Sequence, residues 1–192
     1  MIQLASTLLL ASGSPRRKEI LQLAGFAFEV QTKDIDEVYP PEMALEQVPA
    51  YLAKVKASAF EAEARHKIVL TSDTVVIVEN KIFGKPDNAD HAFEMLKTIS
   101  GTMHEVVSGV CIRFQNKEVI FSDISRVYFK SFTDNEINYY IENYKPFDKA
   151  GAYGVQEWIG MIGIEKIEGS FYNVMGLPIH LVYKELMNFR LN

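Results

Sequence analysis

Residues 8–19 read LLLASGSPRRKE, which joins a short apolar run to a loop of small residues and two adjacent arginines. The apolar run predicts a strand over residues 8–11, and Pro15 suits the first position of a helix, where its missing N–H would be unpaired in any case. Ser14 is a candidate cap for this helix, and Gly25 marks its end. Arginines at the positive end of a helix dipole favour an anion beside them. The stretch therefore predicts either a phosphate site or an ordinary solvated helix start.

Strand and helix patterns alternate along the rest of the chain. A helix opening near Pro49 would bury Leu52, Val55 and Ala59, and Thr133 followed by Glu136 matches a capping box. The mixture predicts an α/β or α+β fold with a mixed sheet. Strands are expected at residues 8–11, 26–30, 68–70, 75–78, 81–83, 106–114, 118–121 and 127–129, with Glu79-Asn80 as the turn into residues 81–83. Helices are expected from residue 15, from residue 49, after a cap at Asp87 or Asn88, from residue 133 and over 178–189.

The 192 residues, 48% of them hydrophobic, can bury one substantial core, so we expect a single domain over residues 1–192 with room for two lobes. A net charge of −5, from 20 basic and 25 acidic residues, argues against a protein that coats nucleic acid or a membrane surface. The single cysteine, Cys111, excludes an internal disulfide and is expected to be buried. With no basic region before the first apolar residues and no apolar stretch of membrane-spanning length, we expect a cytoplasmic protein.

Asp73 is the most informative polar residue, because it interrupts an apolar strand pattern. A carboxylate in such a place needs a cation, a metal ion or backbone amides as its partner. Lys56, Lys85 and Lys149 are candidate cations, although each alone is more readily read as a solvated side chain. The acidic stretch at residues 34–37 can hold a divalent cation through oxygen ligands, or can be a solvated loop.

Residues 147–156, FDKAGAYGVQ, surround polar side chains with small ones and so allow a flat ligand to approach the backbone. Gln156 carries a donor and an acceptor that can pair with the edge of a nucleobase. The alternative is a tight turn in which Asp148 and Lys149 form a local ion pair. The four histidines show no zinc-type spacing, and no serine lies in a nucleophile elbow.

Taken together, these segments resemble the Maf family of nucleoside triphosphate pyrophosphatases, and the resemblance runs nearly from end to end. Six segments in the same order are far more specific than any one of them. They are ASGSPRR at 11–17, SDTVV at 72–76, GKP at 84–86, SG at 100–101 with His104, DKAGAYG at 148–154 and NVMGLP at 173–178.

The resemblance implies an α/β fold of the Maf and inosine triphosphatase type, in which a mixed central sheet is flanked by helices and two lobes surround a cleft. It implies hydrolysis between the α- and β-phosphates of dTTP and UTP with Mg²⁺ or Mn²⁺ as cofactor. A nucleoside triphosphate is the expected partner, and a homodimer is compatible with the resemblance. The alternatives are a pyrophosphatase for another modified nucleotide, such as 7-methyl-GTP, and a non-catalytic nucleotide-binding regulator of cell division.

Carried over residue by residue, the resemblance makes Asp73 the proton acceptor and, with Glu37, a metal ligand. It assigns the substrate to Ser12, Arg16, Arg17, Lys56, Thr74, Lys85 and Gln156, with Arg16, Thr74 and Gln156 at positions that distinguish the dTTP and UTP branch. The chain departs from the pattern at three places. Ser72 replaces a frequent alanine, Tyr144-Lys145 replaces a Gly-Glu pair, and Glu157-Trp158 follows Gln156 where glycine is usual.

Overall fold

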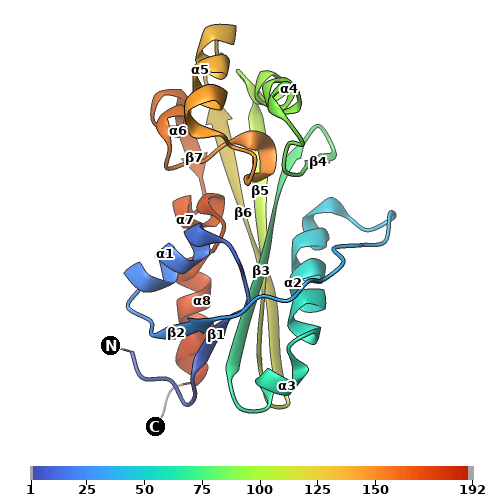
Figure 1. Cartoon of the computed structure of the whole chain (residues 1–192), viewed down its shortest axis with the longest axis vertical. Coiled ribbons are helices and arrows are strands. Elements are labelled where there is room, and N and C mark those ends of the chain that lie inside the picture. The colour runs from blue at the N-terminus through green and yellow to red at the C-terminus, as the bar shows by residue number, and fades with distance from the viewer. Residues whose placement is uncertain (1, 190–192) are drawn as a thin grey trace. The chain divides into compact units, whose positions relative to one another are not determined.

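A computed structural model describes residues 2–189 and shows a seven-stranded sheet of order β2-β1-β3-β5-β6-β7, with β4 paired to β3 (Figure 1). Strand β1 runs parallel to both β2 and β3, whereas β4 is antiparallel to β3 and β7 is antiparallel to β6. The predicted mixed sheet is therefore confirmed. The strands are β1 Leu8–Leu10, β2 Phe28–Val30, β3 Ile68–Val78, β4 Lys81–Phe83, β5 Met103–Phe114, β6 Lys117–Phe129 and β7 Ile164–Glu168.

Helices lie between many of these strands, in keeping with the α/β prediction. Helix α5 begins with the predicted capping box, in which Thr133 Oγ1 accepts from Glu136 N at 3.3 Å and Glu136 Oε2 accepts from Thr133 N at 2.8 Å. Between residues 2 and 189 no helix combines the length and apolarity that crossing a bilayer requires. The helices are α1 Pro15–Leu23, α2 Val48–Ser58, α3 Glu61–Ala64, α4 Ala89–Ile99, α5 Asp134–Tyr144, α6 Trp158–Gly163, α7 Phe171–Met175 and α8 Ile179–Leu186, with short 3₁₀ turns η1 Leu45–Gln47, η2 Ala150–Ala152 and η3 Met187–Phe189.

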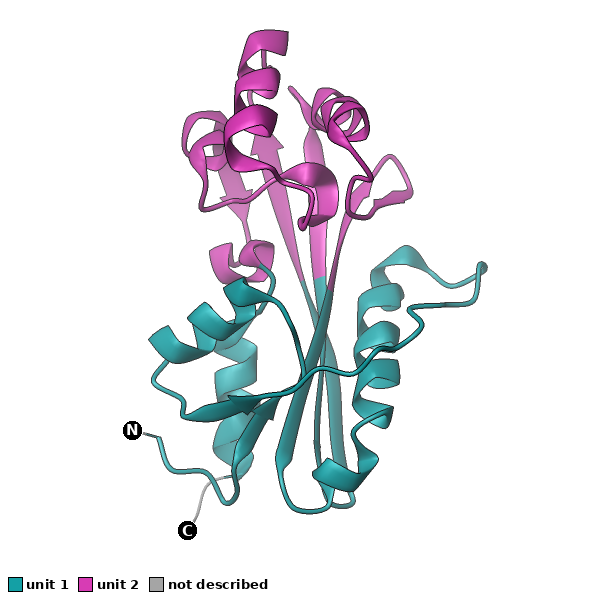
Figure 2. Cartoon of the chain, viewed as in Figure 1, with its two compact units in different colours: residues 1–73, 108–123, 176–192 teal, residues 74–107, 124–175 magenta. Residues whose placement is uncertain are grey.

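The chain divides into two compact units (Figure 2). Unit 1 comprises residues 1–73, 108–123 and 176–192, and unit 2 comprises residues 74–107 and 124–175. The division agrees with the two lobes that the resemblance implies, whereas the cleft stays a prediction.

In unit 1, helix α2 covers one face of the sheet, and α1 and α8 cover the other (Figure 1). Because both faces are covered, β1 and the first three residues of β3 are continuous apolar runs and are fully buried. Cys111 packs against Ala53 and Ala57 of α2, as expected for a buried cysteine. Burial raises the pKa of its thiol to about 12, so it is inert at neutral pH.

Unit 2 contains the β3–β4 hairpin and the helices α4 and α5. Glu79 and Asn80 form the predicted hairpin turn, with φ values of 47° and 60°. Asn88 caps α4 by accepting a hydrogen bond from His91 N at 2.9 Å, as one of the two predicted caps. The buried aromatic rings of Phe129 and Tyr153 pack edge to face beside His104.

Two predictions about strands were wrong. Residues 68–70 and 75–78 belong to one uninterrupted strand, β3, and the polar residues between them are part of it. Residues 118–121 and 127–129 likewise belong to the single strand β6. Both strands contain polar residues in their middle. A prediction based on apolar runs alone places a break between strands at such residues.

Two details of the predicted helices were also wrong. The buried face of α2 is formed by Leu52, Ala53 and Ala57, whereas Ala59 is the exposed residue that follows the helix. Ser14 occupies the cap position of α1 but makes no capping hydrogen bond through its side chain. Its backbone N donates to Ser12 Oγ instead, at 3.3 Å.

Candidate active site

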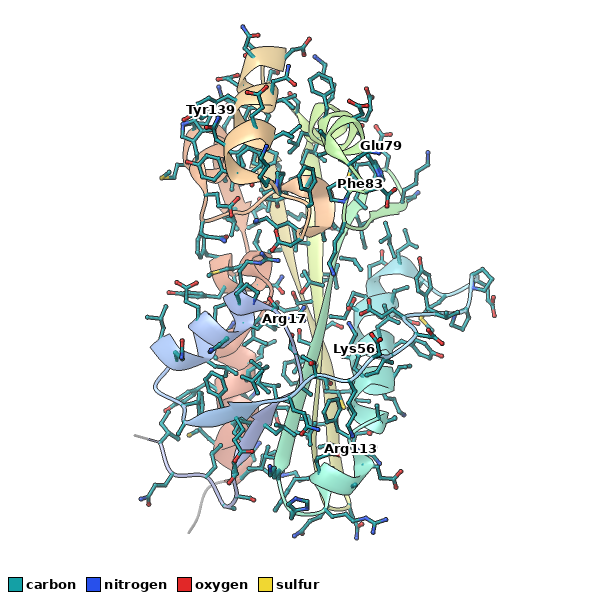
Figure 3. The ribbon with its side chains drawn as sticks, in the orientation of Figure 1. Arg17, Lys56, Glu79, Phe83, Arg113 and Tyr139 are labelled. Atoms are coloured by element: carbon teal, nitrogen blue, oxygen red, sulfur yellow. The ribbon has the colours of Figure 1, made fainter. Side chains whose placement is uncertain are left out.

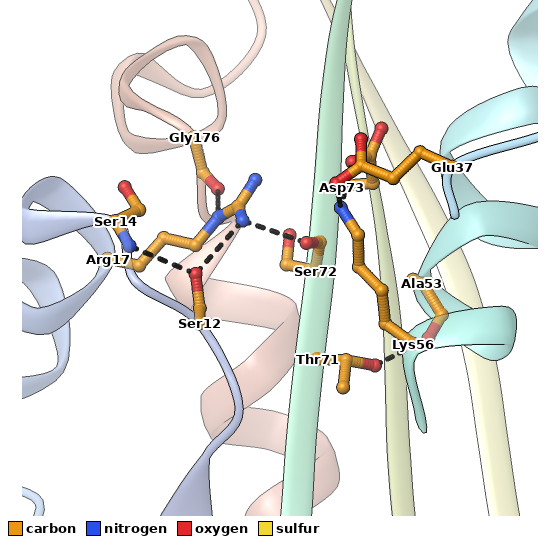
Figure 4. Close-up of polar contacts among 10 residues, drawn as sticks. All are labelled: Ser12, Ser14, Arg17, Glu37, Ala53, Lys56, Thr71, Ser72, Asp73 and Gly176. Carbon is orange, nitrogen blue, oxygen red and sulfur yellow. Dashed lines mark hydrogen bonds and ion pairs between the residues drawn. The ribbon is translucent and has the colours of Figure 1, made fainter. Parts of the chain in front are cut away.

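Asp73 has a lysine as its partner. Its carboxylate is largely buried in β3, and Lys56 Nζ lies 2.5 Å from its Oδ1 (Figure 4). Alternate residues of a strand share a face, and Thr71, two residues earlier, donates to Ala53 O of α2 at 2.6 Å. Both side chains therefore face α2, which supplies Lys56. The ammonium offsets the cost of burying the carboxylate.

Glu37 reaches the same ammonium from the acidic stretch that precedes α2. Its Oε1 lies 2.9 Å from Lys56 Nζ (Figure 4). The Glu37 side chain is 54% exposed, compared with 15% for Lys56 and 11% for Asp73. Two carboxylates therefore converge on one point, one of them enclosed and the other open to solvent. Such a pair attracts a cation and can position a water molecule.

Arg17 connects three segments that lie far apart in the sequence. Its Nη1 donates to Ser72 O at 2.8 Å and to Ser12 Oγ at 3.2 Å, and its Nε donates to Gly176 O at 2.8 Å (Figure 4). Burial lowers the pKa of the guanidinium, while the charge of Asp73 acts in the opposite direction. Figure 3 shows Arg17 leaving α1 and Lys56 leaving α2. These contacts place the ASGSPRR loop beside the middle of β3.

The hydroxyl of Ser12 lies next to the Arg17 guanidinium. Its Oγ accepts hydrogen bonds from Ser14 N at 3.3 Å and from Arg17 Nη1 at 3.2 Å. With both acceptor positions in use, its own O–H is the group left to donate to a ligand. Arg16 is half-buried in the first turn of α1.

The remaining predicted residues belong to unit 2. Thr74 is half-buried and follows Asp73 directly in β3, whereas Lys85 and Gln156 are exposed. Gly151 N donates to Gly84 O at 3.0 Å, which joins the turn that carries Lys85 to the segment that carries Gln156. Thus in unit 1 Lys56 contacts both Glu37 and Asp73, and Arg17 contacts Ser12 and the backbone of the residue before Asp73. In unit 2 one hydrogen bond joins the segments that carry Lys85 and Gln156.

A buried ionic cluster next to Gln156 has no counterpart among the predicted site residues. The predicted ion pair between Lys149 and Asp148 is present, with the two atoms 2.8 Å apart. Lys149 Nζ also lies 3.1 Å from Glu157 Oε1, and the hydroxyl of Tyr140 donates to the other Glu157 oxygen. In the sequence, the only signal for Glu157 was that it follows Gln156 at a position where glycine is usual in the family pattern.

Oxygen ligands for a metal ion are few. Residues 2–189 contain no group of three or more histidine, cysteine, aspartate or glutamate side chains placed to hold one. Glu37 and Asp73 provide two carboxylates that meet at the Lys56 ammonium. Mg²⁺ is commonly held by one or two carboxylates, its remaining ligands being waters and substrate phosphates, so this pair fits such an ion.

The chain is similar to known proteins over nearly its whole length. A family model described as Maf-like protein matches residues 7–189. A dTTP/UTP pyrophosphatase of Cytophaga hutchinsonii is 50% identical over 93% of this chain and 82% of its own length, and one of Flavobacterium johnsoniae is 48% identical over 93% of both chains. A dTTP/UTP pyrophosphatase of Porphyromonas gingivalis is 50% identical over 95% of this chain and 94% of its own.

The fold also matches a solved structure. The Ham1 protein of Staphylococcus aureus superimposes with a TM-score of 0.56 over 95% of this chain and 99% of its own, at 14% identity. At that identity the likeness concerns the fold alone.

Proposed function

The chain belongs to the Maf family, and on this premise we propose that it is a nucleoside triphosphate pyrophosphatase that hydrolyses dTTP and UTP to the monophosphate and pyrophosphate. The observation that carries the proposal is the contact between Asp73 and Lys56, a carboxylate and an ammonium 2.5 Å apart beside the ASGSPRR loop. A protein that only senses nucleotides needs no such base, which argues against a non-catalytic regulator of cell division.

In this proposal Asp73 is the general base. It accepts a proton from a water molecule whose oxygen forms a bond to the α-phosphorus, while the bond from that phosphorus to the bridging oxygen breaks and pyrophosphate leaves. Lys56 orients the carboxylate and faces the charge that develops on the phosphate oxygens. Ser12, Arg16, Arg17 and Lys85 are proposed to bind the phosphates, where preorganised donors supply most of the stabilisation.

Glu37 and Asp73 are the residues proposed to hold a divalent cation, Mg²⁺ or Mn²⁺. Such an ion would neutralise phosphate charge and lower the pKa of a bound water. Lys56 contacts both of these carboxylates, so its ammonium would be a neighbour of such an ion. A cytoplasmic location and a homodimer stay predictions from the sequence.

Thr74 and Gln156 are proposed to select the base. The amide of Gln156 offers one donor and one acceptor, which match the O4 and N3–H edge shared by thymine and uracil. Cytosine reverses this pattern, and a purine is larger. dTTP and UTP should therefore be cleaved well ahead of CTP, GTP and 7-methyl-GTP.

The test is pyrophosphate release from these five nucleotides by the wild type and by Asp73→Asn, with Mg²⁺ or Mn²⁺ and after chelation. We expect Asp73→Asn to lower kcat for dTTP by about 10²-fold or more while dTTP binding stays measurable, as for loss of a general base. Turnover near the wild-type value would remove Asp73 from this role. A preference for a guanine nucleotide would overturn the pyrimidine assignment, and full activity after exhaustive chelation would overturn the metal requirement.

A further inference from the structure

Lys149 is a buried cation held by two carboxylates of unit 2. Its side chain is only 8% exposed, and its Nζ lies 2.8 Å from Asp148 Oδ1 and 3.1 Å from Glu157 Oε1. Asp148 is 53% exposed, whereas Glu157 is 19% exposed, so Glu157 is the enclosed partner. Removing the enclosed partner of a buried charge is strongly unfavourable. The position of the Glu157 carboxylate is therefore fixed by Lys149.

Tyr140 of α5 holds the same carboxylate from another direction. Its hydroxyl donates to Glu157 Oε2 and accepts a hydrogen bond from Gly154 N at 3.0 Å. Burial, reinforced by the hydrogen bond to Glu157, raises the pKa of this hydroxyl well above its usual value. The hydroxyl thus keeps its proton at neutral pH and remains a donor to Glu157.

These contacts enclose a β-turn that contains Gln156. Glu157 N donates to Gly154 O at 3.0 Å, which closes a four-residue turn with Val155 and Gln156 at its centre. A Cβ on Gly154 would lie 2.7 Å from Glu157 Cδ, so the glycine gives the carboxylate room to pack against the turn. Val155 is buried and Gln156 is exposed. The exposed amide is thus carried by a turn whose two ends are both anchored.

We propose that Glu157 is a positioning residue for Gln156, and that Tyr140 and Lys149 hold Glu157 in place for this purpose. The inference rests on the proposed function, in which Gln156 pairs with the thymine or uracil edge. Hydrogen bonds to a base depend on distance and direction, and a turn that is already ordered loses less entropy when the base binds. The Glu157 carboxylate then determines how strongly the enzyme prefers dTTP to CTP.

The test compares Tyr140→Phe and Glu157→Ala with the wild type. Tyr140→Phe removes one hydroxyl and leaves the ion pair between Lys149 and Glu157, so it preserves the fold if Glu157→Ala does not. Tyr144→Phe is the matched control, because it removes a hydroxyl from the same helix, where its ring stacks on Tyr140 with centroids 5.1 Å apart. The readouts are kcat and KM for dTTP and for CTP.

We expect Tyr140→Phe and Glu157→Ala each to lower the ratio of kcat/KM for dTTP to that for CTP by about 10-fold, a cost typical of a small misplacement of a binding group. The change should arise from a higher KM for dTTP with little change in kcat, because the lost interaction acts on binding. Tyr144→Phe should keep the wild-type ratio. The Gly154 amide should also exchange its hydrogen faster in Tyr140→Phe.

Gln156→Ala separates failure of this inference from failure of the proposed function. A wild type without preference for dTTP, or a Gln156→Ala ratio equal to the wild-type ratio, overturns the base assignment and the inference together. If Gln156→Ala lowers the ratio but Tyr140→Phe and Glu157→Ala do not, only the inference is overturned. In the Gln156→Ala background, Glu157→Ala should not lower the ratio further, and an additive effect would show that Glu157 does not act through Gln156.

Discussion

Thr71 and Ser72 are consecutive hydroxyl residues of β3 with different hydrogen-bonding environments. Thr71 Oγ1 donates to Ala53 O at 2.6 Å. Ser72 Oγ is buried, and it forms no hydrogen bond with any atom of residues 2–189. A buried hydroxyl without a partner loses its hydration and gains nothing in return. The two residues should therefore respond in opposite directions to removal of the hydroxyl.

We predict that Ser72→Ala raises the free energy of unfolding by about 1 kcal/mol and that Thr71→Val, its matched control, lowers it by about the same amount. Urea unfolding followed by circular dichroism measures both. A loss of stability in Ser72→Ala as large as that in Thr71→Val would mean that the Ser72 hydroxyl is satisfied in solution.

The sequence predicted that the Asp73 carboxylate has a partner that offsets its burial, but it did not identify which residue this partner is. The need for a partner follows from a carboxylate in an apolar strand, which is costly to bury alone. The sequence could not rank the candidates Lys56, Lys85 and Lys149. What distinguishes them is the residue that each contacts, and that residue can lie far away in the sequence. Only Lys56 is carried by the helix that faces the Asp73 side of β3, and Lys149 is buried because Glu157 meets it. Contacts between residues that are far apart in the sequence leave no local sequence pattern from which to predict them.

At the scale of elements, local signals were the reliable ones. The capping box at Thr133 and the Glu79-Asn80 turn depend on neighbouring residues and were confirmed. The continuity of β3 was missed because TSDT at residues 71–74 has the composition of a loop. Those residues remain in the strand because Thr71 bonds to α2 and Asp73 pairs with Lys56.

Helix α2 must lie close to β5 for Lys56 to reach Asp73, and Gly109 of β5 permits this approach. A Cβ built on Gly109 would clash with backbone atoms of Pro49 and Ala50 in the first turn of α2. The contact involves backbone on both sides, so a rotamer change cannot relieve it. The helix or the strand would have to shift.

We predict that Gly109→Ala lowers the free energy of unfolding by about 1–3 kcal/mol, as overpacking does. It should also lower kcat, because α2 carries Lys56. Gly84→Ala is the control for stability, since a Cβ there meets nothing within 4 Å. Chemical denaturation and steady-state kinetics give the two readouts, and a Gly109→Ala protein as stable as Gly84→Ala would show that α2 does not pack this tightly on β5.

At the scale of the whole molecule, the sequence predicted one domain but not where its two units divide. Strands β3, β5 and β6 each contribute residues to both units, with divisions after residues 73, 107 and 123. A boundary in the middle of a strand has no linker composition to reveal it. Each unit buries an ammonium that meets carboxylates, Lys56 in unit 1 and Lys149 in unit 2, and unit 2 also buries a histidine among aromatic rings.

That histidine, His104, should make the stability of the whole protein depend on pH. Its Nε2 lies 2.7 Å from the Tyr153 hydroxyl, and burial lowers its pKa from 6.5 to about 4. Between these two pH values the unfolded chain binds the proton and the folded protein does not, so stability falls as pH drops through this window. A difference of 2.5 pKa units corresponds to a loss of about 3 kcal/mol.

We predict that this loss is absent from His104→Gln, which keeps a hydrogen-bond acceptor for Tyr153 but does not titrate. Carboxylates also titrate near pH 4, so the informative quantity is the difference in unfolding free energy between the two proteins, followed by urea denaturation from pH 7.5 to 4. The difference should be constant above about pH 6.5, the ordinary pKa of histidine, and should move in favour of His104→Gln below it. Parallel curves over the whole range, or an NMR titration of His104 near its ordinary pKa, would show that the imidazole takes up its proton without disturbing the core of unit 2.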